Sequence, residues 1–191
     1  MGTKQNLRNV IKLATPENWV QGLAWYSEAH LFCTEIHRQT SLTLGQVAGI
    51  TAALSPQCSW QVNKKAAKHL AFGMDCIGYT GYKVNVSKAK RIIQGENVER
   101  VLGKGTRYGA KVRAFYDNIL NPATSDCVTI DTHAIRAAYD IVDVPVNLIR
   151  AVFESKLNLE IQSAYIAVAK EYNVRPCQLQ AVAWLTVKDN L

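Results

Sequence analysis

The chain has 191 residues, of which 48% are hydrophobic and 19% are charged, and this composition is typical of a globular protein with a buried core. No run approaches the roughly 18 consecutive apolar residues of a membrane span. The first residues, MGTKQNLRN, lack the apolar stretch of a secretory signal. We therefore expect neither a membrane protein nor a secreted one.

Helix signals begin at residue 15. Thr15-Pro16-Glu17 predicts a helix start, with a capping side chain followed by a proline and an acid, and the helix is expected to run to about Arg38. Thr43 caps a second helix, LGQVAGITAAL, which is apolar on nearly all sides and is therefore expected in the middle of a core. This helix ends at Ser55-Pro56, because proline biases the residue before it away from the helical conformation.

Helical patterns continue through the rest of the chain. The further predicted helices cover residues 60–72, 86–94, 97–102, a segment from about 110, a segment from 131, and residues 146–157, 160–172 and 176 onward. Ser59 is expected to cap the first of these. Strand-like alternation is nearly absent, so the predicted fold class is all-α.

The positive charge is concentrated in one part of the chain. The formal net charge is +7. Between Lys64 and Arg113 there are twelve Lys and Arg against three acidic residues, a net charge of +9, and the remainder of the chain carries −2. A charged helical face is often no more than a solvated surface. Because the whole excess lies in about one quarter of the chain, the distribution favours a polyanionic partner.

A basic, glycine-containing loop follows, with Gly103, Gly105 and Gly109, and it leads into a helix that carries Lys111 on its first turn. A polar segment then leads to VTIDTHAIR, in which Asp131 stands where another helix should begin. Helix N-termini present outward-facing N–H groups that suit an anion such as a phosphate. The sequence therefore predicts that these two helix starts belong to the functional part of the molecule.

The cysteines give no sign of a metal site. There are five of them, widely spread: Cys33, Cys58, Cys76, Cys127 and Cys177. No Cys-x-x-Cys pair occurs, so neither zinc nor an iron–sulfur cluster is predicted. We expect reduced, mostly buried thiols of a cytoplasmic protein.

Three segments in the middle of the chain carry a family resemblance. LSPQCSWQVNKKAAKHL (54–70) resembles the segment that follows the first core helix of endonuclease III-type enzymes, and VTIDTHAIRAA resembles the stretch with their catalytic aspartate. Gly109-Ala110-Lys111 resembles their hairpin and nucleophile region. On these segments residues 44–138 resemble the helix-hairpin-helix DNA glycosylase superfamily. The hairpin differs from the usual Leu-Pro-Gly-x-Gly, and the terminal cysteine cluster is missing, so the resemblance implies an enzyme without the iron–sulfur centre.

The resemblance implies a two-lobed helical bundle with a helix-hairpin-helix motif. One lobe would be residues 42–133 and the other residues 1–41 plus 134–191, with the substrate pocket between them. A base inside duplex DNA cannot be reached, so the nucleotide must be rotated out of the stack. Asp131 would then be the ionised carboxylate that stabilises the positive charge developing on the deoxyribose. On residue type alone, Asp131 could instead be only a helix cap.

Lys111 has two possible roles by the same resemblance. Its amine could attack the sugar C1′ and form a Schiff base, which would give AP-lyase activity as well. It could instead contact a phosphate while water attacks, and the enzyme would then be monofunctional. Lys104 is the alternative lysine.

The resemblance also implies a set of DNA contacts, in which Gln57 fills the gap left by the extruded nucleotide. The set is Gln57, Trp60, Lys64, Gly103, Lys104, Gly105, Arg107, Gly109, Arg113 and His133. Each of three residues has an alternative role: Gln57 could cap a turn, Trp60 could pack in the core, and His133 could pack locally. Trp25, Tyr26 and His30 are candidate pocket walls. The hairpin would hold one phosphate with a bound monovalent cation, and no other cofactor is expected.

The sequence thus favours a monomeric DNA glycosylase, with or without AP-lyase activity, acting on double-stranded DNA that contains a modified base. Its expected location is the cytoplasm or the nucleoid, or the host cytoplasm if the source is viral. One alternative is a phage-type enzyme on the same scaffold that modifies a hypermodified pyrimidine and leaves the glycosidic bond intact. The other is a non-catalytic DNA-binding module, in which Asp131 is only a cap.

Overall fold

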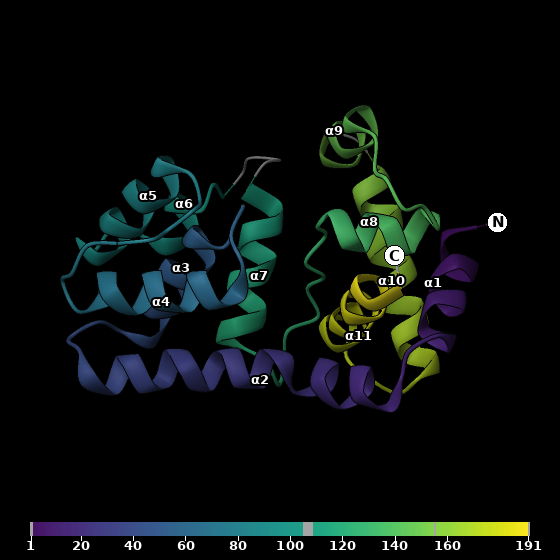
Figure 1. Cartoon of the computed structure of the whole chain (residues 1–191), viewed down its shortest axis with the longest axis horizontal. Helices are drawn as coiled ribbons and strands as arrows, with labels where there is room; N and C mark the ends of the chain where they lie inside the picture. The colour runs from purple at the N-terminus through teal and green to yellow at the C-terminus, as the bar shows by residue number, and fades with distance from the viewer. Residues whose placement is uncertain (1, 105–108, 155, 191) are drawn as a thin grey trace. The chain divides into compact units, whose positions relative to one another are not determined.

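The computed structural model describes residues 2–104, 109–154 and 156–190, and over these residues the chain is all-helical (Figure 1). The helices are α1 (Thr3–Lys12), α2 (Pro16–Gln39), α3 (Leu44–Leu54), α4 (Trp60–Ala71), α5 (Lys83–Ile93), α6 (Val98–Val101), α7 (Ala110–Leu120), α8 (Thr132–Tyr139), α9 (Val146–Glu154), α10 (Leu157–Glu171) and α11 (Pro176–Asn190). No β-strand occurs in these described ranges. The predicted all-α class is confirmed.

Several helix boundaries and one whole helix differ from the sequence-based expectation. Helix α1 was not predicted, because its N-cap, Gly2, makes no side-chain capping bond and so leaves no start signal. Its buried residues Leu7, Val10 and Ile11 nevertheless follow helical spacing. Helix α5 begins at Lys83 rather than 86, and α9 ends at Glu154, with α10 beginning at Leu157.

The chain divides into two compact units. Unit 1 comprises Met1–Tyr26 and Ala123–Leu191, and unit 2 comprises Ser27–Pro122. These limits differ from the expected lobes of 42–133 and 1–41 plus 134–191, for two reasons. The second part of α2 packs on α3, where the Cys33 thiol lies 3.6 Å from the Thr51 hydroxyl, and so it belongs to unit 2. The segment before α8 belongs to unit 1, because Val128 and Ile130 are buried in that unit's core.

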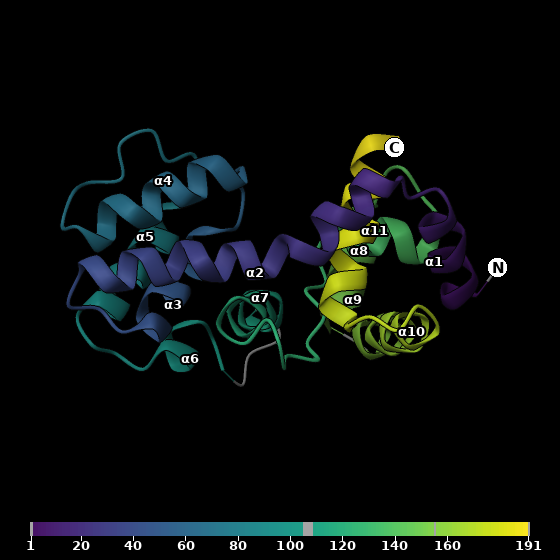
Figure 2. The ribbon, with the colours of Figure 1, turned by 90° about the horizontal axis from the view of Figure 1, so that it is seen from below.

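Unit 2 is built around α3. Figure 1 and Figure 2 both show α3 among α4, α5 and α7, and it contacts all three. Every residue from Val47 to Leu54 is buried, as its apolar pattern predicted. The helix begins with a capping box: the Thr43 hydroxyl accepts from the Gln46 N–H at 3.1 Å, and the Gln46 side chain accepts from the Thr43 N–H at 2.9 Å.

Unit 1 is a cluster of α1, α8, α10 and α11, which contact one another (Figure 2). Its core includes Tyr165, which is fully buried, and Val182. Gly22 of α2 allows a close approach to α11, because a Cβ at that position would lie 2.7 Å from the backbone nitrogen of Val182. Within the part of the chain that is described, no helix combines the length and the hydropathy needed to cross a membrane.

Candidate functional site

The two described ends of the glycine-containing loop meet in unit 2. Helix α6 ends at Val101 and α7 begins at Ala110. Gly109 must lack a side chain, because a Cβ there would lie 2.6 Å from the carbonyl oxygen of Gly103. The Arg113 guanidinium on α7 donates a hydrogen bond to that same carbonyl. The loop is therefore closed at its base, while Gly105 and Arg107, two of its predicted DNA contacts, lie outside the described residues.

Lys111 lies half-buried on the first turn of α7, in unit 2. Its charge acts on the thiol of Cys58, where it lowers the pKa and opposes the larger effect of burial, which raises it. Lys111 is therefore close to the turn before α4. The alternative lysine, Lys104, forms an ion pair with Glu99 at 2.5 Å, and its side chain is 70% exposed.

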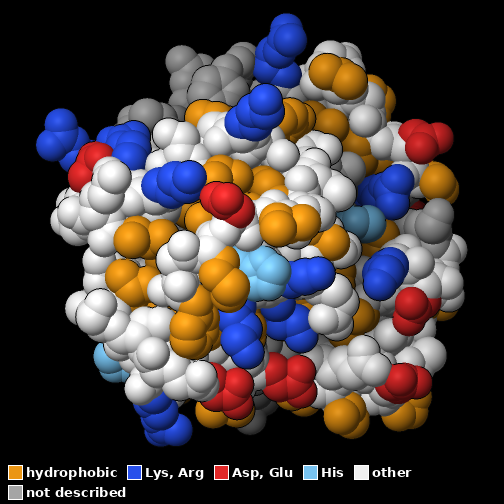
Figure 3. Space-filling view, turned by 60° about the vertical axis from the view of Figure 1, so that its left-hand side comes forward, with side chains coloured by type: hydrophobic (Ala, Val, Ile, Leu, Met, Phe, Trp, Pro, Cys, Tyr) orange, Lys and Arg blue, Asp and Glu red, His pale blue; other side chains and the backbone are white. Residues whose placement is uncertain are grey.

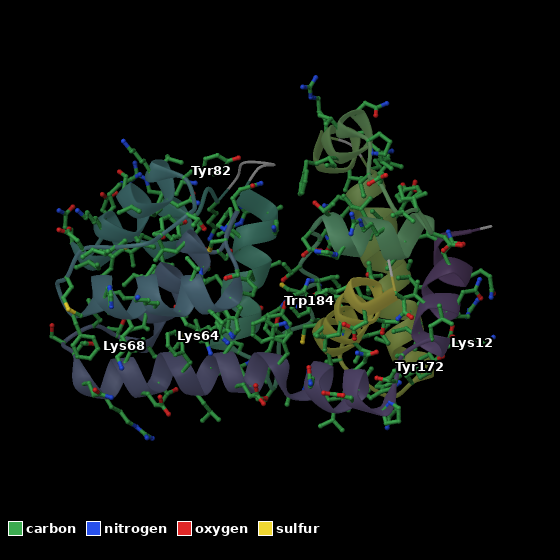
Figure 4. All side chains as sticks on the ribbon, in the orientation of Figure 1. Lys12, Lys64, Lys68, Tyr82, Tyr172 and Trp184 are labelled. Carbon is green, nitrogen blue, oxygen red and sulfur yellow. The ribbon has the colours of Figure 1, made fainter. Side chains whose placement is uncertain are left out.

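Helix α4 presents basic side chains on its outer surface. Lys65 and Lys68 are exposed, and Lys64 is half-buried, with its ammonium 5.6 Å from the centre of the Trp60 ring. Figure 4 shows Lys64 and Lys68 on the same side of α4, one turn apart. Figure 3 shows Lys and Arg side chains spread over one face of the molecule, with hydrophobic side chains between them. This surface suits a polyanion.

Trp60 packs within unit 2. Its ring meets Phe32 of α2 edge-on at 6.0 Å between centroids, and Phe115 of α7 at 6.5 Å. His30, a candidate pocket wall, lies with its ring Nδ1 2.9 Å from the carbonyl oxygen of Ile119. Trp60 and His30 therefore both pack between helices of unit 2, in the region of α2, α4 and α7.

Asp131 is the N-cap of α8, in unit 1. Its carboxylate accepts a hydrogen bond from the Ala134 N–H at 2.8 Å, and the residue is partly exposed. The Tyr165 hydroxyl donates to the carbonyl oxygen of Ala134 at 3.4 Å. Burial raises the pKa of Tyr165 well above its usual value, and the nearby negative charge of Asp131 raises it further. The carboxylate is thus fixed at the N-terminus of α8 by a capping hydrogen bond.

A buried polar network holds the segment that leads to Asp131. The Tyr26 hydroxyl makes hydrogen bonds to the Thr129 hydroxyl at 3.1 Å and to the Gln180 side-chain oxygen at 3.0 Å. All three residues are buried. Tyr26 was expected to be a pocket wall. Because it is only 4% exposed, its observed role is to hold this segment in place.

A half-buried aromatic cluster lies beside Asp131 in unit 1. The His133 ring meets Trp184 edge-on at 6.3 Å, and Trp184 lies 5.9 Å from Trp25. The Lys188 ammonium lies 5.5 Å from the Trp184 ring centre. Figure 4 marks Trp184 on α11. The sequence placed Trp25 among the candidate pocket walls and gave no role to Trp184, because the approach of Trp184 to His133 depends on the packing of α11 against α8.

The predicted site residues therefore fall into two groups. Asp131 and His133 belong to unit 1, as do the candidate pocket walls Trp25 and Tyr26, and the other described ones, with Lys111, belong to unit 2. Within unit 2 the structure brings together Gly103, Gly109 and Arg113, and it places Lys111 near Cys58, the residue after Gln57. Among the described residues, no three His, Cys, Asp or Glu side chains gather as metal ligands.

A comparison with curated proteins gives no significant match, and a comparison with solved structures gives none either. One family model matches residues 2–191, almost the whole chain, and its description is "Family of unknown function (DUF7178)". The match spans both units and every residue of the candidate site. The chain belongs to this family of unknown function, DUF7178.

Proposed function

We propose that this protein is a DNA glycosylase of the helix-hairpin-helix type, in which α6 and α7 are the helices on either side of the hairpin. It would bind duplex DNA that contains a modified base, rotate that nucleotide out and cleave its N-glycosidic bond. The observation that carries the proposal is Asp131, a partly exposed carboxylate fixed by the Ala134 N–H at the start of α8. The resemblance of VTIDTHAIR to the catalytic segment of that superfamily supports the same role.

The charge distribution supports DNA as the partner. Unit 2 holds thirteen Lys and Arg and six Asp and Glu, a formal net charge of +7, whereas unit 1 holds nine of each and is neutral. A surface that neutralises phosphates binds nucleic acid by releasing counterions, which requires clustered positive charge. The closed base of the 102–109 loop and the start of α7 would present backbone N–H groups to one phosphate.

In the proposed reaction the bond between C1′ and the base nitrogen breaks, and its electron pair leaves with the base. The carboxylate of Asp131 stabilises the positive charge that develops on the sugar. Water then adds to C1′ and gives up a proton, for which Asp131 can be the base. If the amine of Lys111 attacks C1′ instead, a Schiff base forms and strand cleavage can follow. The half-buried rings of Trp25 and Trp184 would supply an apolar surface for an extruded base.

A non-catalytic DNA-binding module is the second candidate, and one observation favours it. The hydrogen bond from the Ala134 N–H accounts for Asp131 as a helix cap, and an N-cap is worth about 1 kcal/mol without any catalysis. In that case the basic surface of unit 2 is the functional part, and Asp131 serves only the fold of unit 1.

Base release from a panel of labelled duplexes tests the proposal. The duplexes carry uracil, an oxidised pyrimidine, 8-oxoguanine or 5-hydroxymethyluracil, each with and without borohydride. We expect base release that falls by about 10²- to 10³-fold in Asp131→Asn. A borohydride-trapped adduct that is lost in Lys111→Gln but kept in Lys104→Gln supports the amine mechanism, and release without trapping supports water.

Three outcomes contradict parts of this proposal. Release that is unaffected by Asp131→Asn removes the assigned role of the carboxylate. DNA binding with no release on any substrate supports the non-catalytic module. An altered base that remains joined to its sugar identifies a base-modifying enzyme on the same scaffold.

A further inference from the structure

Gln57 has an unusual backbone conformation on an exposed turn of unit 2. Its φ is +64°, in the left-handed region that residues other than Gly, Asn and Asp seldom adopt. The turn, residues 55–58, connects α3 to α4, and the Gln57 side chain is exposed. A glycine would adopt this conformation without strain. Strained backbone of this kind persists only where surrounding contacts enforce it, and it is concentrated at functional positions.

Tyr79 and Asn85, which follow α4 in the chain, supply those contacts. The Tyr79 hydroxyl donates to the carbonyl oxygen of Leu54 at 2.8 Å. The Asn85 side-chain amide donates to the Tyr79 hydroxyl at 3.2 Å and to the carbonyl oxygen of Pro56 at 3.4 Å. Pro56 directly precedes Gln57. The backbone carbonyls of Leu54 and Pro56, on the approach to the strained residue, therefore both accept hydrogen bonds.

The contacts are partly buried. Asn85 is 5% exposed, and burial raises the pKa of Tyr79, so its hydroxyl remains a proton donor. The Cys58 thiol also donates to the Leu54 carbonyl, at 3.1 Å. The turn is therefore bonded on both sides of Gln57. The Gln57 side chain, which carries both a donor and an acceptor, extends into solvent from this bonded turn.

We propose that Tyr79 and Asn85 are positioning residues, which fix the 55–58 turn so that Gln57 can enter a DNA duplex beside an extruded nucleotide. This inference rests on the proposed function. Entry of a flexible side chain would cost conformational entropy, and a turn already fixed in the bound conformation avoids that cost. The left-handed backbone at Gln57 is then maintained for binding, at the expense of the stability of unit 2.

The test uses two otherwise identical duplexes, one intact and one with a tetrahydrofuran abasic analogue opposite 2-aminopurine. The analogue leaves a gap like that beside an extruded nucleotide, and the fluorescence of 2-aminopurine reports a side chain that enters the gap. The affinity ratio between the duplexes isolates this entry from phosphate binding, which both duplexes share.

We expect the full-length wild-type protein to prefer the abasic duplex and to change the 2-aminopurine fluorescence. Tyr79→Phe, which removes only the hydroxyl, and Asn85→Ala should each lower that preference by about three- to tenfold, the effect of losing one or two hydrogen bonds. Affinity for the intact duplex should stay unchanged. The matched control is Tyr82→Phe, because Tyr82 lies in the same segment and is 57% exposed (Figure 4).

Two substitutions of Gln57 keep the test valid if the positioning variants lose stability. Gln57→Gly should abolish the preference and raise the melting temperature, because glycine relieves the backbone strain. Gln57→Asn should retain part of the preference, since asparagine tolerates this conformation and keeps the amide.

The outcomes separate this inference from the proposed function. The inference is overturned if Tyr79→Phe prefers the abasic duplex as strongly as Tyr82→Phe does, or if the wild type binds both duplexes equally. This holds even where base release depends on Asp131. If base release is absent but the preference falls in Tyr79→Phe, the inference stands and the glycosylase proposal fails.

Discussion

The two units differ in charge and in what they bury. Unit 2 carries the entire net charge of +7 and is built around α3, whose residues 47–54 are all buried. Unit 1 has no net charge, and it buries the polar network of Tyr26, Thr129 and Gln180 beside Asp131. A charged surface needs only a stable support, whereas a carboxylate that acts on one atom must be held in place. Under the proposed function, this difference would give DNA attraction to unit 2 and the carboxylate chemistry of Asp131 to unit 1.

The largest expected effect tests the role given to unit 1. Asp131→Asn keeps a side chain that can cap α8, so the melting temperature should change little. It removes the negative charge, and base release should fall by about 10²- to 10³-fold, the size reported for loss of one electrostatic contact in a transition state. Duplex affinity measured in parallel should stay within about twofold, because phosphate contacts dominate it. A parallel loss of binding and release would instead indicate damage to the fold.

The close packing of unit 1 can be compared with that of unit 2 by adding one methyl group to each. In Gly22→Ala the new Cβ meets the backbone of Val182, which cannot move aside. In Gly49→Ala it meets the side chain of Val98. We expect Gly22→Ala to lower the free energy of unfolding by about 1–3 kcal/mol, the usual cost of overpacking, and Gly49→Ala to lower it less. Urea unfolding of both variants measures the difference, and the reverse order would contradict this account of the α2–α11 approach.

Features fixed by local hydrogen bonds could be predicted from the sequence. The starts of α3, α4 and α8 were predicted because Thr43, Ser59 and Asp131 each bond to an N–H group three residues later. The buried position of α3 followed from its apolar surface on all sides. These signals lie within a few residues of the structure they specify.

Features that depend on long-range packing could not be predicted in the same way. Trp184 and Gln180 approach residues 129–133 from about fifty positions further along the chain, and helical periodicity does not specify that approach. The division inside α2 also depends on tertiary contacts, because one continuous helix contributes to two cores. The turn that contains Gln57 is likewise bonded by Tyr79 and Asn85, more than twenty positions further along the chain.

A moderate effect tests the role given to unit 2. Lys65 and Lys68 are exposed on α4, and Lys65→Gln with Lys68→Gln should reduce the slope of log affinity against log salt by about two if each contacts a phosphate. The matched control is Lys12→Gln with Lys170→Gln, which removes two exposed lysines from unit 1. Titrations at several salt concentrations measure both slopes. An equal reduction in the two double variants would mean that DNA binding is not confined to unit 2.

The smallest expected effect compares one exposed ion pair in each unit. Arg91 lowers the pKa of Glu96 in unit 2 through a direct hydrogen bond, and Arg8 lowers the pKa of Glu171 in unit 1 in the same way. Because each carboxyl has a lower pKa folded than unfolded, its contribution to stability is present above the ordinary carboxyl value. That contribution is lost as the pH falls through the lowered folded value. Exposed ion pairs contribute little to stability, so the change in urea midpoint on removing either pair should be close to the limit of measurement.

Urea midpoints of Glu96→Gln and Glu171→Gln over a series from about pH 7 to about pH 2 measure these contributions, because each contribution is lost as the carboxyl takes up its proton. Each variant should unfold slightly earlier than the wild type at the higher pH and together with it at the lower one. A difference that persists at the lower pH would come from packing rather than from the ion pair. If the two units unfold in separate transitions, Glu171→Gln should move only that of unit 1 and Glu96→Gln only that of unit 2, since each pair lies within one unit.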